Sequence, residues 1–349
     1  MSPEWQAIPY RASWVDLVIG RLDGYRGPAW LAFSSLGILG IVVGNAAGWL
    51  EGKPGPLDLY NTVFGLFPVV ELALIRHLDR VAASALAGFR PLLVGDEASY
   101  LDLERRLTTA PRGPTAAYTA AWVVGGLLGV ASDPGAHRVD GVGPLTAAVV
   151  VGVEVMINAL LGVLILKAGR HIRDVARIHR EAPRIDLLNP APLYAFSRLT
   201  SQTALGLLFL VAILVLSLAR AYFTDALAPT RVFFVFTMAG LVVAAMAIFV
   251  LPLYDMHRRI VVEKERLQAA SGQRLKTLLG ELDHDIRTLE LARADGLNKL
   301  LGSALSEREI LSRLPTWPWQ AATLRGFMTA LLVPVLVYLL ARAAERVVL

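Results

Sequence analysis

Apolar runs long enough to cross a lipid bilayer constrain this chain more than any other feature of its sequence. A transmembrane helix needs about 20 mostly apolar residues, and a helix satisfies its own backbone hydrogen bonds inside the bilayer. Six such runs carry one charge or none, and they lie at 29–50, 59–75, 115–132, 141–166, 199–219 and 232–254. The pattern predicts an all-α polytopic membrane protein whose first six helices form three hairpins.

A further run, 326–341, predicts a final crossing that is shorter than the others. It has 16 residues and contains Pro334. As a helix it would measure about 24 Å, which is less than the hydrocarbon core of a bilayer. Extending it back to Thr316 adds one charge, Arg325, whose long side chain can reach the membrane interface. We therefore expect about seven transmembrane helices, with the seventh and the C-terminus in 316–349.

Lysine and arginine are distributed unevenly between the segments that join these runs. Cytoplasmic segments of helical membrane proteins carry an excess of these two residues. With a cytoplasmic N-terminus, 28 of the 34 fall in the inner segments and 6 in the outer ones. We therefore predict a multi-pass protein of the inner, or plasma, membrane with its N-terminus in the cytoplasm. The predominance of arginine over lysine, 29 to 5, further suggests a prokaryotic protein.

A short amphipathic stretch before the first run predicts an interfacial helix. Ser13 and Asp16 have the spacing of a capping box, in which each side chain bonds to the backbone N–H of the other residue. One face of this helix is expected to be apolar and to lie at the membrane surface. That face contains Trp14, Leu17, Val18 and Leu22.

The segment 255–315 is the longest stretch outside the membrane, and it contains a stripe typical of a coiled coil. Apolar residues step by four and three along it; they are Leu275, Leu279, Leu282, Ile286 and Leu289. An isolated helix of this length is marginal in water. The stripe is therefore expected to pack against the cytoplasmic arms at 76–114 and 167–198 or against a second protomer. Gly296 and Gly302 are expected to interrupt the helix.

Together these features predict four parts with one membrane domain at the centre. The arms between the hairpins and the segment after the sixth helix are expected to form one helical layer beneath the membrane. In order, the parts are an N-terminal interfacial helix at 1–28, a six-helix membrane domain at 29–254, a cytoplasmic helical or coiled-coil segment at 255–315, and the seventh helix with the C-terminus at 316–349.

Glu154 is the one charged residue of the 141–166 run and lies near its middle. A carboxylate at the bilayer centre costs about 2.5–3.5 kcal/mol on insertion scales, so it must face protein or water or stay protonated. Asn158 follows one turn later on the same face and can donate a hydrogen bond to it. We favour a role of both residues in a pore or in ion coupling. The alternative is a protonated glutamate that joins two helices through a hydrogen bond.

Glu71, in the 59–75 run, is another candidate for a pore or ion-coupling residue. It lies about one turn after Pro68, which frees a backbone carbonyl and is typical of the broken helices of some transporters. A structural role is favoured here, because Glu71 is near enough to the inner interface to pair with Arg76 or with a neighbouring arm.

The sequence contains no pattern that indicates an enzyme. Cysteine is absent, which excludes thiolate nucleophiles, disulfides and cysteine-bound metals. There is also no P-loop, no Gly-x-Ser-x-Gly motif and no His-Glu-x-x-His motif. We therefore expect no catalytic residue, cofactor or metal site.

An oligomeric ion channel or pore-like protein is the function that these features favour, with the cytoplasmic helices holding the subunits together. The expected partners are the lipid bilayer, further copies of the chain and a small ion, but not nucleic acid. Two alternatives stay open. One is a secondary transporter that uses Glu154 within the membrane, and the other is a non-transporting scaffold or signalling subunit.

Overall fold

The structure, a computed structural model of the chain, is built from helices. Apart from an isolated bridge between Ala12 and Pro111, no strand occurs among the residues that the structure describes. The prediction of an all-α protein is confirmed for this part of the chain. The described residues are 11–25, 27–52, 55–93, 95–135, 137–181, 186–187, 189–223, 229–288, 291–319, 321–333, 336 and 339.

Several of the helices are much longer than a bilayer crossing requires. In chain order the elements are α1 Trp14–Asp23, α2 Ala29–Leu50, α3 Leu59–Phe89, η2 Arg90–Leu92, α4 Glu97–Thr108, α5 Arg112–Ser132, α6 Pro144–Glu181, η3 Pro192–Tyr194, α7 Ala195–Phe223, α8 Pro229–Thr288, α9 Leu291–Arg313 and α10 Ala321–Leu331. With 31, 38 and 60 residues, α3, α6 and α8 exceed the ~20 of a crossing. The segments predicted as arms therefore begin as direct continuations of apolar helices.

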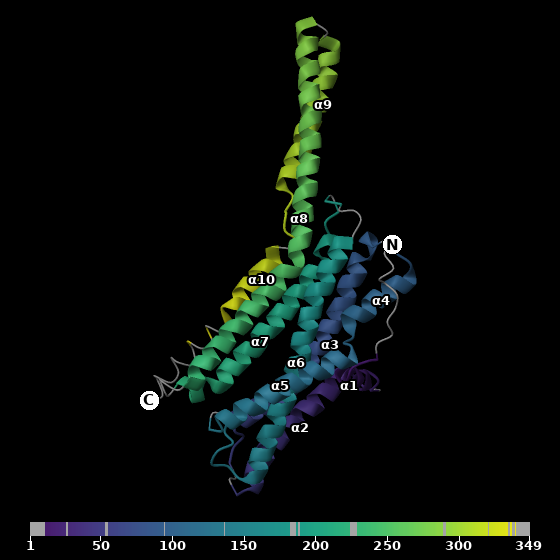
Figure 1. Cartoon of the computed structure of the whole chain (residues 1–349). Helices are drawn as coiled ribbons and strands as arrows, with labels where there is room; N and C mark the ends of the chain where they lie inside the picture. Colours follow the sequence, from purple (N-terminus) through teal and green to yellow (C-terminus); the bar gives the residue numbers. More distant parts are fainter. Residues whose placement is uncertain are drawn as a thin grey trace.

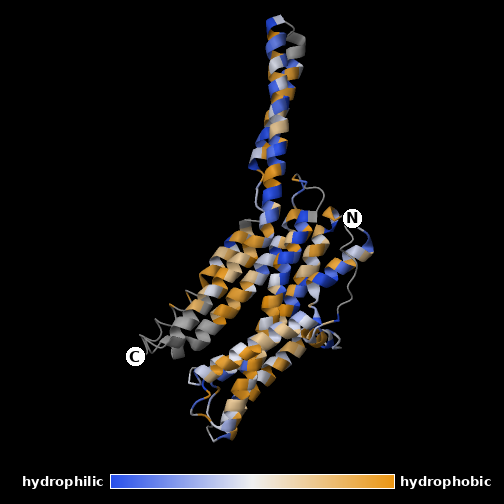
Figure 2. Cartoon of the chain, viewed as in Figure 1, coloured by the Kyte–Doolittle hydropathy of each residue, from blue (hydrophilic) through white to orange (hydrophobic). Residues whose placement is uncertain are grey.

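Six helices in the described part are long and apolar enough to cross a membrane, and each overlaps one of the six predicted runs. Hydrophobic residues predominate along the helices of the bundle (Figure 2), and α2 exposes large ones such as Ile38 and Val43. Such a surface is compatible with lipid around the bundle. With 11 residues, α10 is not one of the six. The seventh crossing stays a prediction, because most of 334–349 lies outside the described residues.

The long helices pair as three hairpins, α2–α3, α5–α6 and α7–α8 (Figure 1). The loops at 51–58 and 133–143 lie at one end of the bundle, here called the loop end. The Glu51 carboxylate joins them, because it accepts hydrogen bonds from the Thr146 hydroxyl and the Leu145 backbone N–H, at 2.6 Å each. The C-terminal halves of α3 and α6 lie with α4 at the opposite end, here called the arm end (Figure 1).

Glycine faces glycine where α2 and α3 cross. A β-carbon added at Gly40 would collide with the carbonyl oxygen of Gly65, and one added at Gly65 would collide with that of Gly40. About one turn along α2, Gly44 lies in the same way against the carbonyl of Asn61. Small residues permit this backbone contact, which is a common mode of packing between membrane helices.

A buried group of charges, here called the Lys167 cluster, joins the helices at the arm end. The Lys167 ammonium on α6 donates to both carboxylate oxygens of Asp79 on α3, at 2.7 and 2.8 Å. It also reaches Asp16 on α1, at 3.3 Å, and the carbonyl oxygen of Thr108 on α4, at 3.0 Å. Asp16 accepts a further hydrogen bond from the backbone N–H of Ala110, at 3.1 Å. One cation thus connects four helices.

The same face of α6 caps the C-terminus of α4. The last carbonyl groups of a helix have no partners within it, and cationic side chains stabilise that end of the helix dipole. Arg170, His171 and Lys167 bond to the carbonyl oxygens of residues 106–108, at 3.0 Å each. The arm formed by α4 is therefore fixed on the extension of α6.

The first helix agrees with its prediction in position and capping, and it packs on the bundle with a different set of residues from the predicted membrane-facing set. Both halves of the predicted capping box are present. The residues that α1 buries are Val15 and Ile19, whereas Trp14 and Leu17 of the predicted face are exposed. Exposed apolar residues on α1 are compatible with a face at the membrane surface, so that expectation stays a prediction, while Asp16 ties the helix to the Lys167 cluster.

The segment after the sixth crossing forms a helical hairpin that projects from the arm end (Figure 1). Helix α8 continues without a break through 255–288, and α9 returns beside it. The expected interruption at Gly296 and Gly302 is wrong, because α9 runs through both and the chain reverses between Thr288 and Leu291. A glycine inside a helix costs only about 1 kcal/mol relative to alanine, so packing along the hairpin can offset it.

The two helices of this hairpin meet along a seam that only partly uses the predicted stripe. On α8 the buried or half-buried residues of the seam are Ser271, Leu275, Leu278, Leu282 and Asp285. Leu275 and Leu282 belong to both sets, but Leu279 and Ile286 are 49% and 55% exposed. Leu289 lies outside the described residues. Pairing with α9 therefore leaves one edge of the predicted stripe uncovered within this chain.

Side chains at the base of the hairpin fix it to the bundle. The Lys264 ammonium donates to the carbonyl oxygens of Ser312 and Leu314, at 2.8 and 2.7 Å. Aromatic rings then stack in a row between α8 and α10, with centroids 3.9 to 5.2 Å apart; the row is His257, Trp317, Trp319, Phe249 and Phe327. The base of the hairpin and the apolar core are therefore connected by direct side-chain contacts.

We expect Lys167→Met to destabilise the protein strongly, because it leaves Asp79 and Asp16 buried without their cation. Removing one partner of a buried ion pair costs about 3–5 kcal/mol. Lys299→Met is the matched control, since the Lys299–Asp295 pair on α9 is exposed and such pairs contribute about 0–1 kcal/mol. Thermal unfolding in detergent measures both variants. Equal melting temperatures would contradict the role given to the Lys167 cluster.

The absence of cysteine allows the predicted orientation to be tested with single-cysteine variants and no background signal. Leu57→Cys lies at the loop end and Ser303→Cys lies on α9, and both positions are exposed. In intact cells a membrane-impermeant maleimide should label Leu57→Cys, and it should label Ser303→Cys only after the membrane is permeabilised. The reverse pattern would place the N-terminus outside.

Candidate functional site

Glu154 lies with His137 and Asn158 in a polar group between α5 and α6, here called the Glu154 cluster. Its carboxylate Oε1 is 3.1 Å from Nδ1 of His137, which belongs to the loop before α6. The Asn158 amide donates to the backbone carbonyl oxygen of Glu154, at 2.8 Å, and lies 3.5 Å from Oε2 of its carboxylate. The carboxylate therefore has one partner from its own helix and one from the loop end.

Small residues on α5 make room for the Glu154 cluster. A β-carbon added at Gly126 would overlap the Asn158 amide, and one added at Gly129 would lie 3.7 Å from the His137 ring. The Glu154 side chain is 9% exposed and that of His137 is 24% exposed. The carboxylate is therefore shielded, and the more exposed member of the cluster belongs to the loop end.

The loop that carries His137 is held by the neighbouring residue, Arg138. Arg138 has a φ of 54°, a left-handed conformation that costs a residue with a side chain about 1–2 kcal/mol. Its guanidinium donates to both carboxylate oxygens of Asp58, at 3.2 Å each, and lies 4.5 Å from the centroid of the Tyr60 ring. These contacts with the other loop stabilise the conformation that turns His137 toward Glu154.

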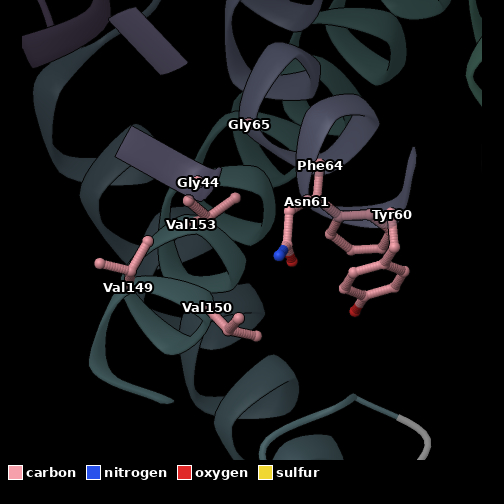
Figure 3. Close-up of a pocket in the computed structure, with 8 residues that line it drawn as sticks. All are labelled: Gly44, Tyr60, Asn61, Phe64, Gly65, Val149, Val150 and Val153. Carbon is pink, nitrogen blue, oxygen red and sulfur yellow. The ribbon is translucent and has the colours of Figure 1, made fainter. Parts of the chain in front are cut away.

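A narrow hollow lies between α2, α3 and α6 (Figure 3). Its lining residues are Gly44, Tyr60, Asn61, Phe64, Gly65, Val149, Val150 and Val153. The walls are mostly apolar, and the space suits about one water molecule. Phe64 also carries the carbonyl that Pro68, inside α3, leaves without its usual helical donor. The hollow therefore places both space and a free acceptor in the half of α3 nearer the loop end.

Glu71 is fully buried in α3. Its exposed fraction is 0%, and neither carboxylate oxygen has a hydrogen-bond partner among the described residues. Apolar side chains of α3, α6 and α7 make up the core cluster in this region, including Phe67, Ile75, Leu160, Leu164, Leu207 and Leu208. A buried polar group without a partner is unusual in a folded protein and calls for a specific explanation.

Among the described residues, the expected pairing of Glu71 with Arg76 or with an arm does not occur. Arg76 forms an ion pair with Asp23 at the end of α1. Residues five apart on a helix point about 140° away from each other, so Arg76 faces α1 while Glu71 faces the core. The only cation of α6 in this region, Lys167, is held in the Lys167 cluster.

The structure brings Glu154 and Asn158 together but separates them from the other predicted features. Glu71 lies on a different helix, in the apolar core. The leucine stripe lies beyond the arm end on the projecting hairpin (Figure 1). The candidate residues therefore form three separate places rather than one site.

His137 is the member of the Glu154 cluster that the sequence did not reveal. The sequence gives little indication that His137 belongs to a site, since it is one titratable residue in a short loop that the charge pattern places outside the membrane. Its approach to Glu154 depends on the left-handed turn at Arg138 and on the contact with Asp58. The two acids that bind Lys167, Asp16 and Asp79, were also not predicted. They lie 151 and 88 residues from Lys167 along the chain, so no local pattern links them to it.

The chemistry available in the Glu154 cluster is reversible binding of a proton or a small cation. A carboxylate is a hard oxygen ligand that suits such ions, and an adjacent imidazole can exchange a proton with it. No group of three or more side chains with metal-binding chemistry occurs in the part of the chain that the structure describes.

Comparison with protein-family models, with curated proteins and with solved structures finds no match to this chain. Its function therefore has to follow from its own residues. The relevant features are the Glu154 cluster, the buried Glu71 and the projecting hairpin.

Proposed function

We propose that this protein transports a small cation across a membrane, with Glu154 as a residue that binds the ion. The Glu154 cluster carries the proposal. It holds a carboxylate inside a helix that is long and apolar enough to span a bilayer, and His137 and Asn158 are its partners. Ionisable residues at such positions are rare and usually serve ion or proton pathways.

The position of His137 in a loop, and not on a helix, favours reversible ion binding over a fixed structural role. Structural hydrogen bonds between membrane helices commonly join side chains of two neighbouring helices. His137 instead belongs to a loop and is partly exposed. Because Arg138 fixes this loop on Asp58, the bond to Glu154 opens by rotation of the His137 side chain and not by movement of a helix. Opening would give the carboxylate access to water at the loop end.

The packing of the bundle favours a transporter over a permanently open pore within one copy. Large apolar side chains from several helices are fully buried in its centre, among them Ile75, Leu164 and Leu207. An ion crosses such an interior only when helices move, as in the alternating access of secondary transporters. A channel would therefore need its path between copies of the chain.

An oligomeric channel is the second candidate, and the hairpin of α8 and α9 is the observation that favours it. Large aliphatic side chains along this hairpin are 49 to 57% exposed; they are Leu279, Ile286, Leu300, Leu305 and Ile310. The sequence places this segment in water, where a two-helix hairpin with exposed apolar residues gains stability by further packing. Contact between hairpins of neighbouring copies would bring membrane domains together around a shared path.

We expect Glu154→Gln to lower cation flux into reconstituted vesicles by at least about tenfold, because glutamine keeps the size of the side chain but cannot take up a charge or a proton. Fluxes of H⁺, Na⁺ and K⁺ are measured separately with ion-sensitive dyes. Glu309→Gln, at an exposed position of α9, is the control and should leave flux unchanged. Normal flux with a lower melting temperature in Glu154→Gln would assign Glu154 a structural role instead.

The channel candidate predicts that Leu279→Glu lowers the oligomeric state, because it introduces charges into a contact between hairpins. Thr277→Glu, two residues earlier on the same exposed helix, is the matched control. Light scattering of the detergent-solubilised protein gives the number of copies for each variant. A wild-type monomer would exclude the channel candidate and leave the transporter.

A further inference from the structure

The position of Glu71 is unusual for a carboxyl group in any protein. Its side chain has no exposed surface, and both of its oxygens lack partners within the described part of the chain. A buried carboxylate without a counter-ion is strongly disfavoured, and such groups become neutral instead. Neutrality requires either a bound metal cation or a bound proton.

The surroundings of Glu71 decide between these two ions. A metal cation of this kind needs several oxygen ligands arranged around it. Neither oxygen of Glu71 has a hydrogen-bond partner among the described residues, and no group of three or more metal-binding side chains occurs among them. A proton needs no further ligand once it is bound to a carboxylate oxygen, so it is the ion that this position can hold.

The charged groups of α6 and α3 that lie nearest to Glu71 along these helices are paired with other residues. On α6 the nearest are Glu154, bound to His137, and Lys167, in the Lys167 cluster. On α3 itself Arg76 is bound to Asp23. The sequence of α2 and the stretch of α7 from Leu199 to Ala219 contain no charge. The buried carboxyl therefore has no cation nearby that could replace the proton.

A hollow and a backbone carbonyl without its usual helical donor lie between the loop end and Glu71 along α3. The hollow of Figure 3 reaches Phe64, which lies seven residues, or about 10 Å, before Glu71 along α3. Between them Pro68 leaves the Phe64 carbonyl free to accept a hydrogen bond from a water molecule. Helices interrupted in this way are tolerated in membranes where water or a neighbouring group satisfies the freed carbonyl.

We propose that Glu71 is an occluded proton-binding site that takes up protons from the loop end through this hollow, and that the proton is the cation transported. The identity of the transported ion rests on the proposed function, whereas the bound proton does not. In each cycle a proton adds to a carboxylate oxygen of Glu71 and leaves again from the same atom, so the step is balanced without any other reactant. Glu71 on α3 and Glu154 on α6 are separate sites on two helices of one bundle.

Infrared spectroscopy tests the bound proton directly and does not depend on transport. A protonated carboxyl has a carbonyl stretch that is separate from the amide bands and shifts in D₂O. At neutral pH the wild type should show such a band that Glu71→Gln lacks. Glu71→Asp, which keeps a carboxyl, should retain a band and serves as a second variant if Glu71→Gln does not fold. No difference between the wild type and Glu71→Gln would overturn the proposal.

Proton flux in vesicles tests the role of Glu71 in transport. We expect Glu71→Gln to abolish voltage-driven proton uptake, while the conservative Glu71→Asp retains part of it. Loss of the infrared band together with normal proton flux would overturn the transport role and leave the function proposed for Glu154 standing. A wild type that moves no cation would refute that function, and the infrared band would still decide whether Glu71 holds a proton.

Discussion

The bonds of one buried ammonium group hold the arm end of this protein together. Lys167 binds two acids and a helix terminus, and through them it connects α1, α3, α4 and α6. The Lys167 cluster ties α1 to α3 and α6 and fixes α4 on α6, so these helices are joined at one end of the apolar bundle. Buried pairs of this kind contribute little net stability compared with an apolar core, but the loss of one partner is costly. They specify geometry more than they add free energy.

Buried polar groups in this fold differ in how completely they are satisfied. Lys167 has a full set of acceptors, Glu154 has a loop imidazole and an amide, and Glu71 has no partner among the described residues. The three groups lie at different places in the bundle, with Lys167 at the arm end, Glu154 toward the loop end and Glu71 in the core. A charged group whose hydrogen bonds are all made stabilises one conformation of the protein, whereas a group without a partner gains most from binding an ion.

Much of the helical architecture could be predicted from the sequence, because apolar runs and cationic loops are signals within single segments. The six apolar helices, the capping box of α1 and the extended arms follow from such local patterns. Long-range pairings could not be predicted. The bond of His137 to Glu154 depends on a left-handed residue, Arg138, and the partner of Arg76 proved to be Asp23 rather than Glu71. The predicted break at Gly296 and Gly302 was wrong because a glycine ends a helix only when packing does not offset its cost.

Because α8 is uninterrupted, a small tilt at its base produces a large displacement at its far end. From Pro252, inside the helix, to Thr288 the chain rises about 54 Å. A tilt of about 5° at the base, where proline weakens the helix, displaces the far end by about 5 Å. The stacked rings between α8 and α10 and the bonds of Lys264 lie at the base of the hairpin. By this geometry, a small tilt at the base of the segment would be magnified at the tip, and a load at the tip would act on the core.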